Sequence, residues 1–134
     1  MVDPVEPTPR ELDILKVLWE HGEASVRAVY EELRERLPIV QNTVQAFLRT
    51  MEEKGLVEHR VEGRTFIYVP VLQREQTSRR MVSGVLERVF DGALDELVES
   101  ALALRRPTQG ELERLKRLVD DAESSRSRRR GRRS

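Results

Sequence analysis

The sequence predicts a mostly helical protein with one small β-hairpin. Two observations support this fold class. Apolar side chains recur at helical spacing over residues 12–51 and again over residues 81–122, whereas residues 56–70 alternate with the period of two that is typical of strands. The 134 residues are enough for one compact domain or two small ones.

The first predicted helix begins after Thr8. Thr8 can cap it, Pro9 suits the first helical position, and Glu11 completes a capping box. Gly22 provides the left-handed residue that ends a helix. The apolar stripe consists of Leu12, Ile14, Leu15, Val17, Leu18 and Trp19.

Two further helices follow. Ser25 starts the second, which should end near Leu37–Pro38, because the residue before a proline avoids helical geometry. The third lies within residues 37–55 and ends at Gly55. Its predicted buried stripe is Val44, Phe47, Leu48 and Met51.

Residues 56–70 are predicted to form the hairpin. A two-residue turn at Glu62–Gly63 would place Val57 opposite Tyr68 and His59 opposite Phe66. Three helices followed by a hairpin, in about 70 residues, is the order of a winged helix-turn-helix, whose third helix enters the major groove of DNA. We therefore assign residues 1–72 to a DNA-binding domain.

Residues 73–123 are predicted to form three helices with apolar stripes, the last of them starting at a second capping box, Thr108 to Glu111. So few short helices cannot build a core of their own, and a second copy of the chain is the simplest partner. The residues predicted to form this dimer interface are Val82, Val85, Leu86, Val89, Phe90, Leu94, Leu97, Leu112, Leu115 and Leu118.

The formal net charge of zero hides an asymmetry. Residues 124–134 hold six arginines and no acid, and their composition predicts a disordered tail. The rest of the chain has 18 basic and 24 acidic side chains. This balance is an objection to DNA binding unless acids of the second and third helices point away from the groove. Those acids are Glu31, Glu32, Glu35, Glu52 and Glu53.

Composition excludes several other classes. Without cysteine there is no disulfide and no thiolate metal site, and no apolar run approaches the length of a membrane span. His21 and His59 lie in different elements without carboxylates at ligand spacing, so no metal site is predicted. The sequence contains no recognisable nucleophile–base pair and no phosphate-binding loop. We therefore predict neither an enzyme nor a bound cofactor. We expect a cytoplasmic protein.

The first turn of the third helix carries Asn42, Thr43 and Gln45. Such residues can simply start a helix, but on a recognition helix their side chains can also pair with base edges. Arg49 is either a solvated residue or a phosphate contact. Arg60 and Arg64 near the hairpin turn could bind phosphates, protect an edge strand, or do both.

Three segments together resemble the penicillinase-repressor family: TPRELDILKVLWEHGEASVRAVYEEL, NTVQAFLRTMEEKGLVEHRVEGRTFIYVP and VLERVFDGALDELV. The resemblance covers residues 8–120. It implies a homodimeric repressor whose third helix reads a palindromic operator upstream of antibiotic-response genes. It places base reading on Asn42, Thr43 and Gln45, and backbone contacts on Arg49, Arg60 and Arg64.

This sequence departs from the family in three ways, and each limits which family properties can be expected of it. The copper-responsive members use a C-terminal cysteine cluster that is absent here, so copper sensing through it is excluded. Sensor-controlled members are cleaved at an Asn-Phe bond, whereas the corresponding position here is about Ser100–Ala101, which leaves a regulatory protease as an open partner. The arginine tail lies beyond the family's usual end. The alternative function is a dimeric winged-helix adaptor or antirepressor that binds protein rather than DNA.

Overall fold

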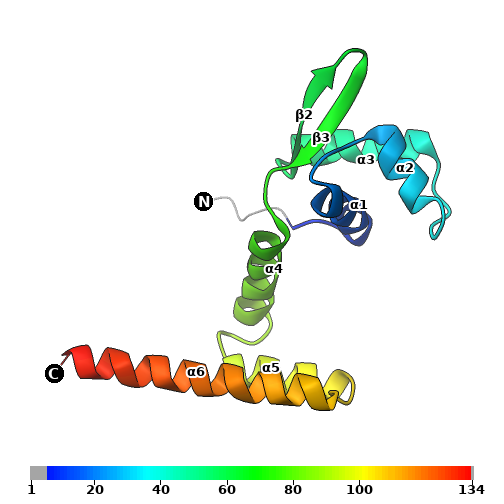
Figure 1. The fold of residues 1–134 in the computed structure, drawn as a ribbon. Helices are drawn as coiled ribbons and strands as arrows, with labels where there is room; N and C mark the ends of the chain where they lie inside the picture. The colour runs from blue at the N-terminus through cyan, green and yellow to red at the C-terminus, as the bar shows by residue number, and fades with distance from the viewer. Residues whose placement is uncertain (1–5, 134) are drawn as a thin grey trace. The chain divides into compact units, whose positions relative to one another are not determined.

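The computed structural model describes residues 6–133, and the side chains of residues 6–129 (Figure 1). The chain divides into two compact units, which we call the N-terminal unit (Met1–Val85) and the C-terminal unit (Leu86–Ser134). The division falls inside α4 (Arg74–Arg88), whereas the sequence placed the boundary after residue 72. The start of α4 is tied to the N-terminal unit because the Trp19 indole donates a 2.9 Å hydrogen bond to the Leu72 carbonyl just before it.

Before α4, the N-terminal unit is built from three helices and a three-stranded antiparallel sheet, which confirms the predicted fold class. Its elements are α1 (Pro9–His21), β1 (Ala24–Ser25), α2 (Val26–Leu33), α3 (Gln41–Glu53), β2 (Val57–Glu62) and β3 (Thr65–Pro70). The buried apolar core consists of Ile14, Leu15, Val17, Leu18, Ala24, Val29, Leu33, Val44, Leu48, Met51, Val57 and Tyr68. Helices α1, α2 and α3 therefore all contribute to one core.

Local signals determine the starts of α1 and α2. Thr8 and Glu11 form the predicted capping box, and the Ser25 hydroxyl accepts a hydrogen bond from the Ala28 backbone. Helix α2 ends at Leu33, four residues before the predicted end, and the chain then turns. The short strand β1 was not predicted, because two residues show no periodicity and pair only with the distant β3.

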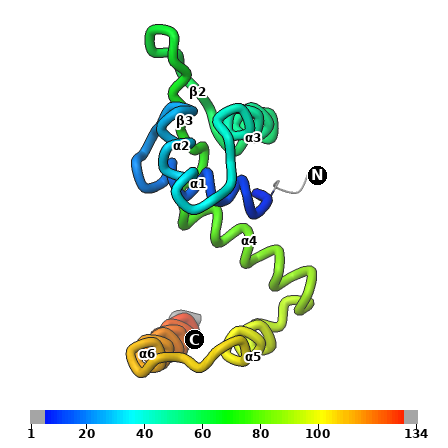
Figure 2. The backbone as a smooth tube through the Cα atoms, turned by 90° about the vertical axis from the view of Figure 1, so that its right-hand side faces the viewer, coloured from blue at the N-terminus to red at the C-terminus, as the bar shows by residue number. Residues whose placement is uncertain are grey.

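The hairpin differs from the predicted register by two residues. Val57 pairs with Pro70, His59 with Tyr68 and Glu62 with Thr65, so the turn residues are Gly63 and Arg64. Gly63 has φ +65° at the first turn position, where a type II′ turn requires a positive φ. A shift of two keeps every side chain on its predicted face, because the side-chain period of a strand is also two. The hairpin extends beyond the helices of its unit (Figure 2).

The C-terminal unit continues α4 into a turn at Asp91 and Gly92, both with positive φ, and then contains α5 (Leu94–Leu104) and α6 (Gln109–Arg133). The predicted capping box at the start of α6 is present: the Thr108 hydroxyl accepts from the Glu111 backbone, and the Glu111 carboxylate accepts from the Thr108 backbone. None of the described side chains of residues 86–129 is buried.

The arginine-rich tail differs from its predicted disorder. Helix α6 continues through Arg133, and residues 124–129 are all exposed; Ser134 lies outside the described residues. Arginine is a good helix former, and extending an existing helix requires no new nucleation. No helix in the described part of the chain has the length and apolar character needed to cross a membrane.

Candidate nucleic-acid interface

Helix α3 is held on the N-terminal unit by one face only. Val44, Leu48 and Met51 are completely buried, and Phe47 packs partly against the same core. This is the predicted stripe, and it fixes which face of α3 turns outward. Asn42, Thr43, Gln45, Ala46 and Arg49 are exposed on the remaining surface.

The polar first turn of α3 does not cap the helix. The N-cap residue is Val40, and no side chain caps the helix start. Within the described part of the chain, the side chains of Asn42, Thr43 and Gln45 have no hydrogen bond or ion pair. Asparagine and threonine that merely start a helix would normally accept a backbone N–H. The arrangement instead leaves two amides and a hydroxyl available to an external partner.

The hairpin is locked to the end of α3 through His59. The Nδ1 atom of His59 lies 2.7 Å from both carboxylate oxygens of Glu52, near the end of α3. The His59 ring stacks on Phe66 with centroids 4.1 Å apart, and its centroid lies 5.6 Å from that of Tyr68. Burial raises the pKa of the Tyr68 hydroxyl, and the charge of Glu52 raises it further. Together these contacts set the position of the hairpin relative to α3.

Arg60 is already engaged within the unit. Its two terminal nitrogens donate to the two carboxylate oxygens of Glu23 at 2.9 and 2.7 Å, and one of them also donates to Glu62 at 3.0 Å. The hydrogen bond from Arg60 lowers the pKa of the Glu23 carboxyl. A DNA phosphate would have to compete with two carboxylates for this guanidinium. The sequence could not reveal Glu23 as a partner, because it lies 37 residues from Arg60.

Arg49 and Arg64 are placed differently from Arg60. Both are exposed, Arg49 on α3 and Arg64 in the hairpin turn. Neither side chain has a hydrogen bond or ion pair among the residues that the structure describes. Their guanidinium groups are therefore available, and each presents a planar fork that matches a phosphate.

Three of the acids that were an objection to DNA binding contact other side chains inside the unit. Glu31, Glu32 and Glu52 each lie within salt-bridge distance of a basic partner. These partners are Arg27 at 3.0 Å, His21 at 2.7 Å and His59 at 2.7 Å, respectively. Arg27 offsets the charge of Glu31 locally, whereas His21 and His59 offset Glu32 and Glu52 only when they are protonated.

Comparisons with known proteins find a similar sequence and similar solved structures. The chain is 26% identical over 111 residues to the penicillinase repressor of Bacillus licheniformis, covering 83% of this chain and 87% of that protein. A solved complex of monomeric Bacillus licheniformis BlaI with the blaP half-operator is 29% identical, with a TM-score of 0.48, covering 56% of this chain and 92% of that one. The fold is shared with a possible transcriptional regulator for arsenical resistance, at 24% identity and a TM-score of 0.51, covering 69% of this chain and 86% of that one.

The family comparison covers most of the chain. The family model described as Penicillinase repressor matches residues 7–121, which include most of both compact units but not the arginine-rich end of α6. The chain therefore belongs to the penicillinase repressor family, whose members are DNA-binding transcriptional repressors rather than enzymes.

Proposed function

We propose that this protein is a homodimeric repressor that recognises a palindromic operator and controls antibiotic- or stress-response genes in the cytoplasm. The observation that carries the proposal is the first turn of α3. Asn42, Thr43 and Gln45 are exposed and without partners among the described residues, on a helix whose opposite face is buried. Amide side chains can form bidentate hydrogen bonds with the major-groove edge of adenine.

The backbone contacts of this proposal fall first on Arg49 and Arg64. Both are exposed and have no partner among the described residues, so each can pair with a phosphate without losing an existing ion pair. Arg60 is a weaker candidate, because a phosphate would have to displace Glu23. Phosphate contacts of this kind position a protein on DNA but do not select a sequence.

Dimerisation is proposed through the C-terminal unit and the adjoining part of α4. Apolar side chains on these helices are largely exposed, among them Val82 at 53%, Val89 at 65% and Leu94 at 62%. A helix with an uncovered apolar stripe is stabilised by a partner that removes the stripe from water. A two-fold dimer would also match a palindromic operator, because the two recognition helices would face equivalent half-sites.

The alternative, a winged-helix adaptor that binds protein, is less well supported. An adaptor does not require unpaired amides on the outward face of α3, nor uncommitted arginines on both α3 and the hairpin turn. Membership of the penicillinase repressor family also favours DNA binding over an adaptor function. A regulatory protease acting near Ser100–Ala101 remains part of the proposal, since these residues are exposed on α5.

Selection of bound sequences from random DNA tests the proposal. We expect an enriched motif with two-fold symmetry and half-sites separated by about 10 bp or a multiple of it, on one face of the DNA. Gln73→Ala, in the same unit but away from α3, should select the same motif as the unchanged protein. Recovery of no motif would favour the adaptor, and an asymmetric motif that Gln45→Ala leaves unchanged would contradict base reading by α3 in a two-fold dimer.

A further inference from the structure

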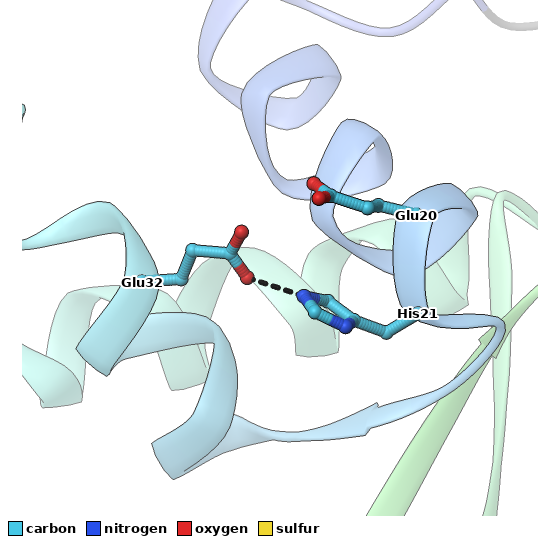
Figure 3. Close-up of side chains that lie close together, drawn as sticks. All are labelled: Glu20, His21 and Glu32. Atoms are coloured by element: carbon cyan, nitrogen blue, oxygen red, sulfur yellow. Dashed lines mark hydrogen bonds and ion pairs between the residues drawn. The ribbon is translucent and has the colours of Figure 1, made fainter.

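A second cluster of polar side chains lies away from the outward face of α3, at the junction of α1 and α2 (Figure 3). Glu20 and His21 are the last two residues of α1, and Glu32 is next to last in α2. One potential ligand atom from each residue lies within 4.8 Å of the other two. The sequence predicted no metal site because these residues are up to twelve positions apart, and only the fold gathers them.

The electrostatics of this cluster favour a cation. Glu20 and Glu32 bring two carboxylates close together, and the only basic group of the cluster is the His21 imidazole, which lies 2.7 Å from Glu32. Among the described residues, Glu20 has no ion pair of its own. The cluster also lies at the C-terminal ends of two helices, whose unpaired carbonyls add negative potential. Two carboxylates and the negative ends of two helices thus meet beside one imidazole.

We propose that Glu20, His21 and Glu32 bind a divalent transition-metal ion such as Zn²⁺. One imidazole nitrogen and two carboxylate oxygens form a donor set that suits Zn²⁺, with water completing a four-coordinate site. Ligands at ~2.1 Å from a tetrahedral ion lie roughly 3.4 Å apart, so small side-chain rotations would bring the three donors to ligating distance. The side chains have room for this, because His21 and Glu32 are 49% and 34% exposed.

The consequence of binding is a cross-link between α1 and α2. Helix α2 packs against α3, so the ion would brace the support of the recognition helix without touching its outward face. Binding to the folded state alone stabilises that state by mass action. The proposal does not depend on DNA binding, so it stands or falls separately from the repressor function.

The chain has only two histidines and no cysteine, which makes a direct test possible. His59 also faces a carboxylate, Glu52, but is not part of a three-ligand cluster among the described residues, so it is an internal control. NMR signals of both imidazoles are followed in the full-length, tag-free protein during titration with Zn²⁺. We expect the His21 signals to shift saturably with one ion per chain, and the His59 signals to stay in place.

Matched variants separate a metal site from a simple ion pair. Glu20→Gln and Glu32→Gln should each lower the Zn²⁺ affinity by about tenfold or more, because each removes a ligand, while Glu31→Gln on the same helix should not. Mg²⁺ should leave His21 unchanged, since this ion prefers six oxygen ligands. The melting temperature should rise with Zn²⁺ only where His21 and both ligand carboxylates are present. No saturable shift at His21, equal shifts at both histidines, or unchanged affinity in both ligand variants would overturn the proposal.

Discussion

Leu48 and Leu118 are both leucines on the apolar stripe of a helix, yet Leu48 is completely buried and Leu118 is 48% exposed. Leu48 belongs to the N-terminal unit, where three helices and a sheet enclose one core. Leu118 belongs to the C-terminal unit, in which no described side chain is buried. Similar stripes therefore have different surroundings: the first completes a core within one chain, and we propose that the second is covered by a second copy of the chain.

The two capping boxes repeat this contrast at the scale of single residues. Thr8–Glu11 and Thr108–Glu111 make the same reciprocal hydrogen bonds. The Glu11 carboxylate, however, is 1% exposed and also accepts hydrogen bonds from Lys54 at 2.9 and 3.0 Å. Glu111 pairs with Arg105 on an exposed surface. One motif thus serves as a buried anchor in the N-terminal unit and as a surface cap in the C-terminal unit.

The largest expected effect is on the C-terminal unit. Leu115→Glu places a charge on the apolar stripe of α6 and should abolish the proposed dimer, because a buried unpaired charge is strongly unfavourable. Analytical ultracentrifugation should then find monomers at protein concentrations where the unchanged chain is dimeric. A folded monomer of the unchanged chain at micromolar concentration would contradict the proposed difference between the two units.

Leu48→Ala is the matched change in the N-terminal unit. It should lower the free energy of unfolding by about 2–5 kcal/mol, the usual cost of truncating a fully buried leucine. Chemical denaturation monitored by Trp19 fluorescence measures this. We expect the decrease to be independent of protein concentration for Leu48→Ala, whereas the destabilisation caused by changing the α6 stripe should depend on concentration. If the destabilisation depended on protein concentration in the same way for Leu48→Ala and for the α6 variant, the proposed difference between the two units would be wrong.

Glu11→Gln and Glu111→Gln sharpen the second contrast. Burial opposes ionisation of Glu11, but hydrogen bonds from the Thr8 backbone and Lys54 outweigh it, so the pKa of Glu11 lies below its ordinary value. Losing hydrogen bonds to this buried charge should cost about 1.5–3 kcal/mol. Glu111→Gln should cost less, because the Glu111–Arg105 ion pair lies on an exposed surface, where such pairs contribute little to stability. Denaturation of both variants under the same conditions measures the difference, and equal costs would contradict it.

The lowered pKa of Glu111 predicts how the stability of the fold changes with pH. The hydrogen bond from Arg105 and that from the Thr108 backbone lower the pKa of Glu111 to about 2. A carboxylate with a lowered folded-state pKa stabilises the fold fully above its unfolded-state pKa of about 4.3, and this stabilisation disappears as the pH falls through the folded-state value. Carboxyl NMR titration checks this. A Glu111 midpoint near its ordinary value would mean that the Arg105 pair does not persist in solution.

Sequence reasoning succeeded where the signal is local and failed where it depends on distant contacts. The capping boxes at Thr8 and Thr108 and the buried stripe of α3 need only a few neighbouring residues, and all are present. The hairpin register was wrong because it depends on which turn position Gly63 occupies. The Glu23 partner of Arg60 could not be predicted, since the fold alone brings these residues together.

The smallest expected effects are on the salt dependence of DNA binding, and they should differ between Arg60 and Arg64 of the hairpin. Arg64→Ala should flatten the log–log salt dependence of DNA binding by ~0.9 for each phosphate that the protein no longer neutralises. Arg60→Ala should change this slope much less, because Arg60 is held by Glu23 and Glu62. Binding of one DNA duplex is measured over a series of salt concentrations. A larger change for Arg60→Ala than for Arg64→Ala would mean that DNA displaces the two carboxylates.

Gln45→Ala tests whether the outward face of α3 reads base edges. Binding is measured for the unchanged protein, Gln45→Ala and Arg49→Ala against a panel of operators that differ by single bases. We predict that Gln45→Ala weakens binding to the preferred operator by about 1–3 kcal/mol and relaxes base choice at one symmetric pair of positions. Arg49→Ala should weaken binding to all sequences alike. Uniform weakening by Gln45→Ala, or no weakening at all, would contradict base reading by the first turn of α3.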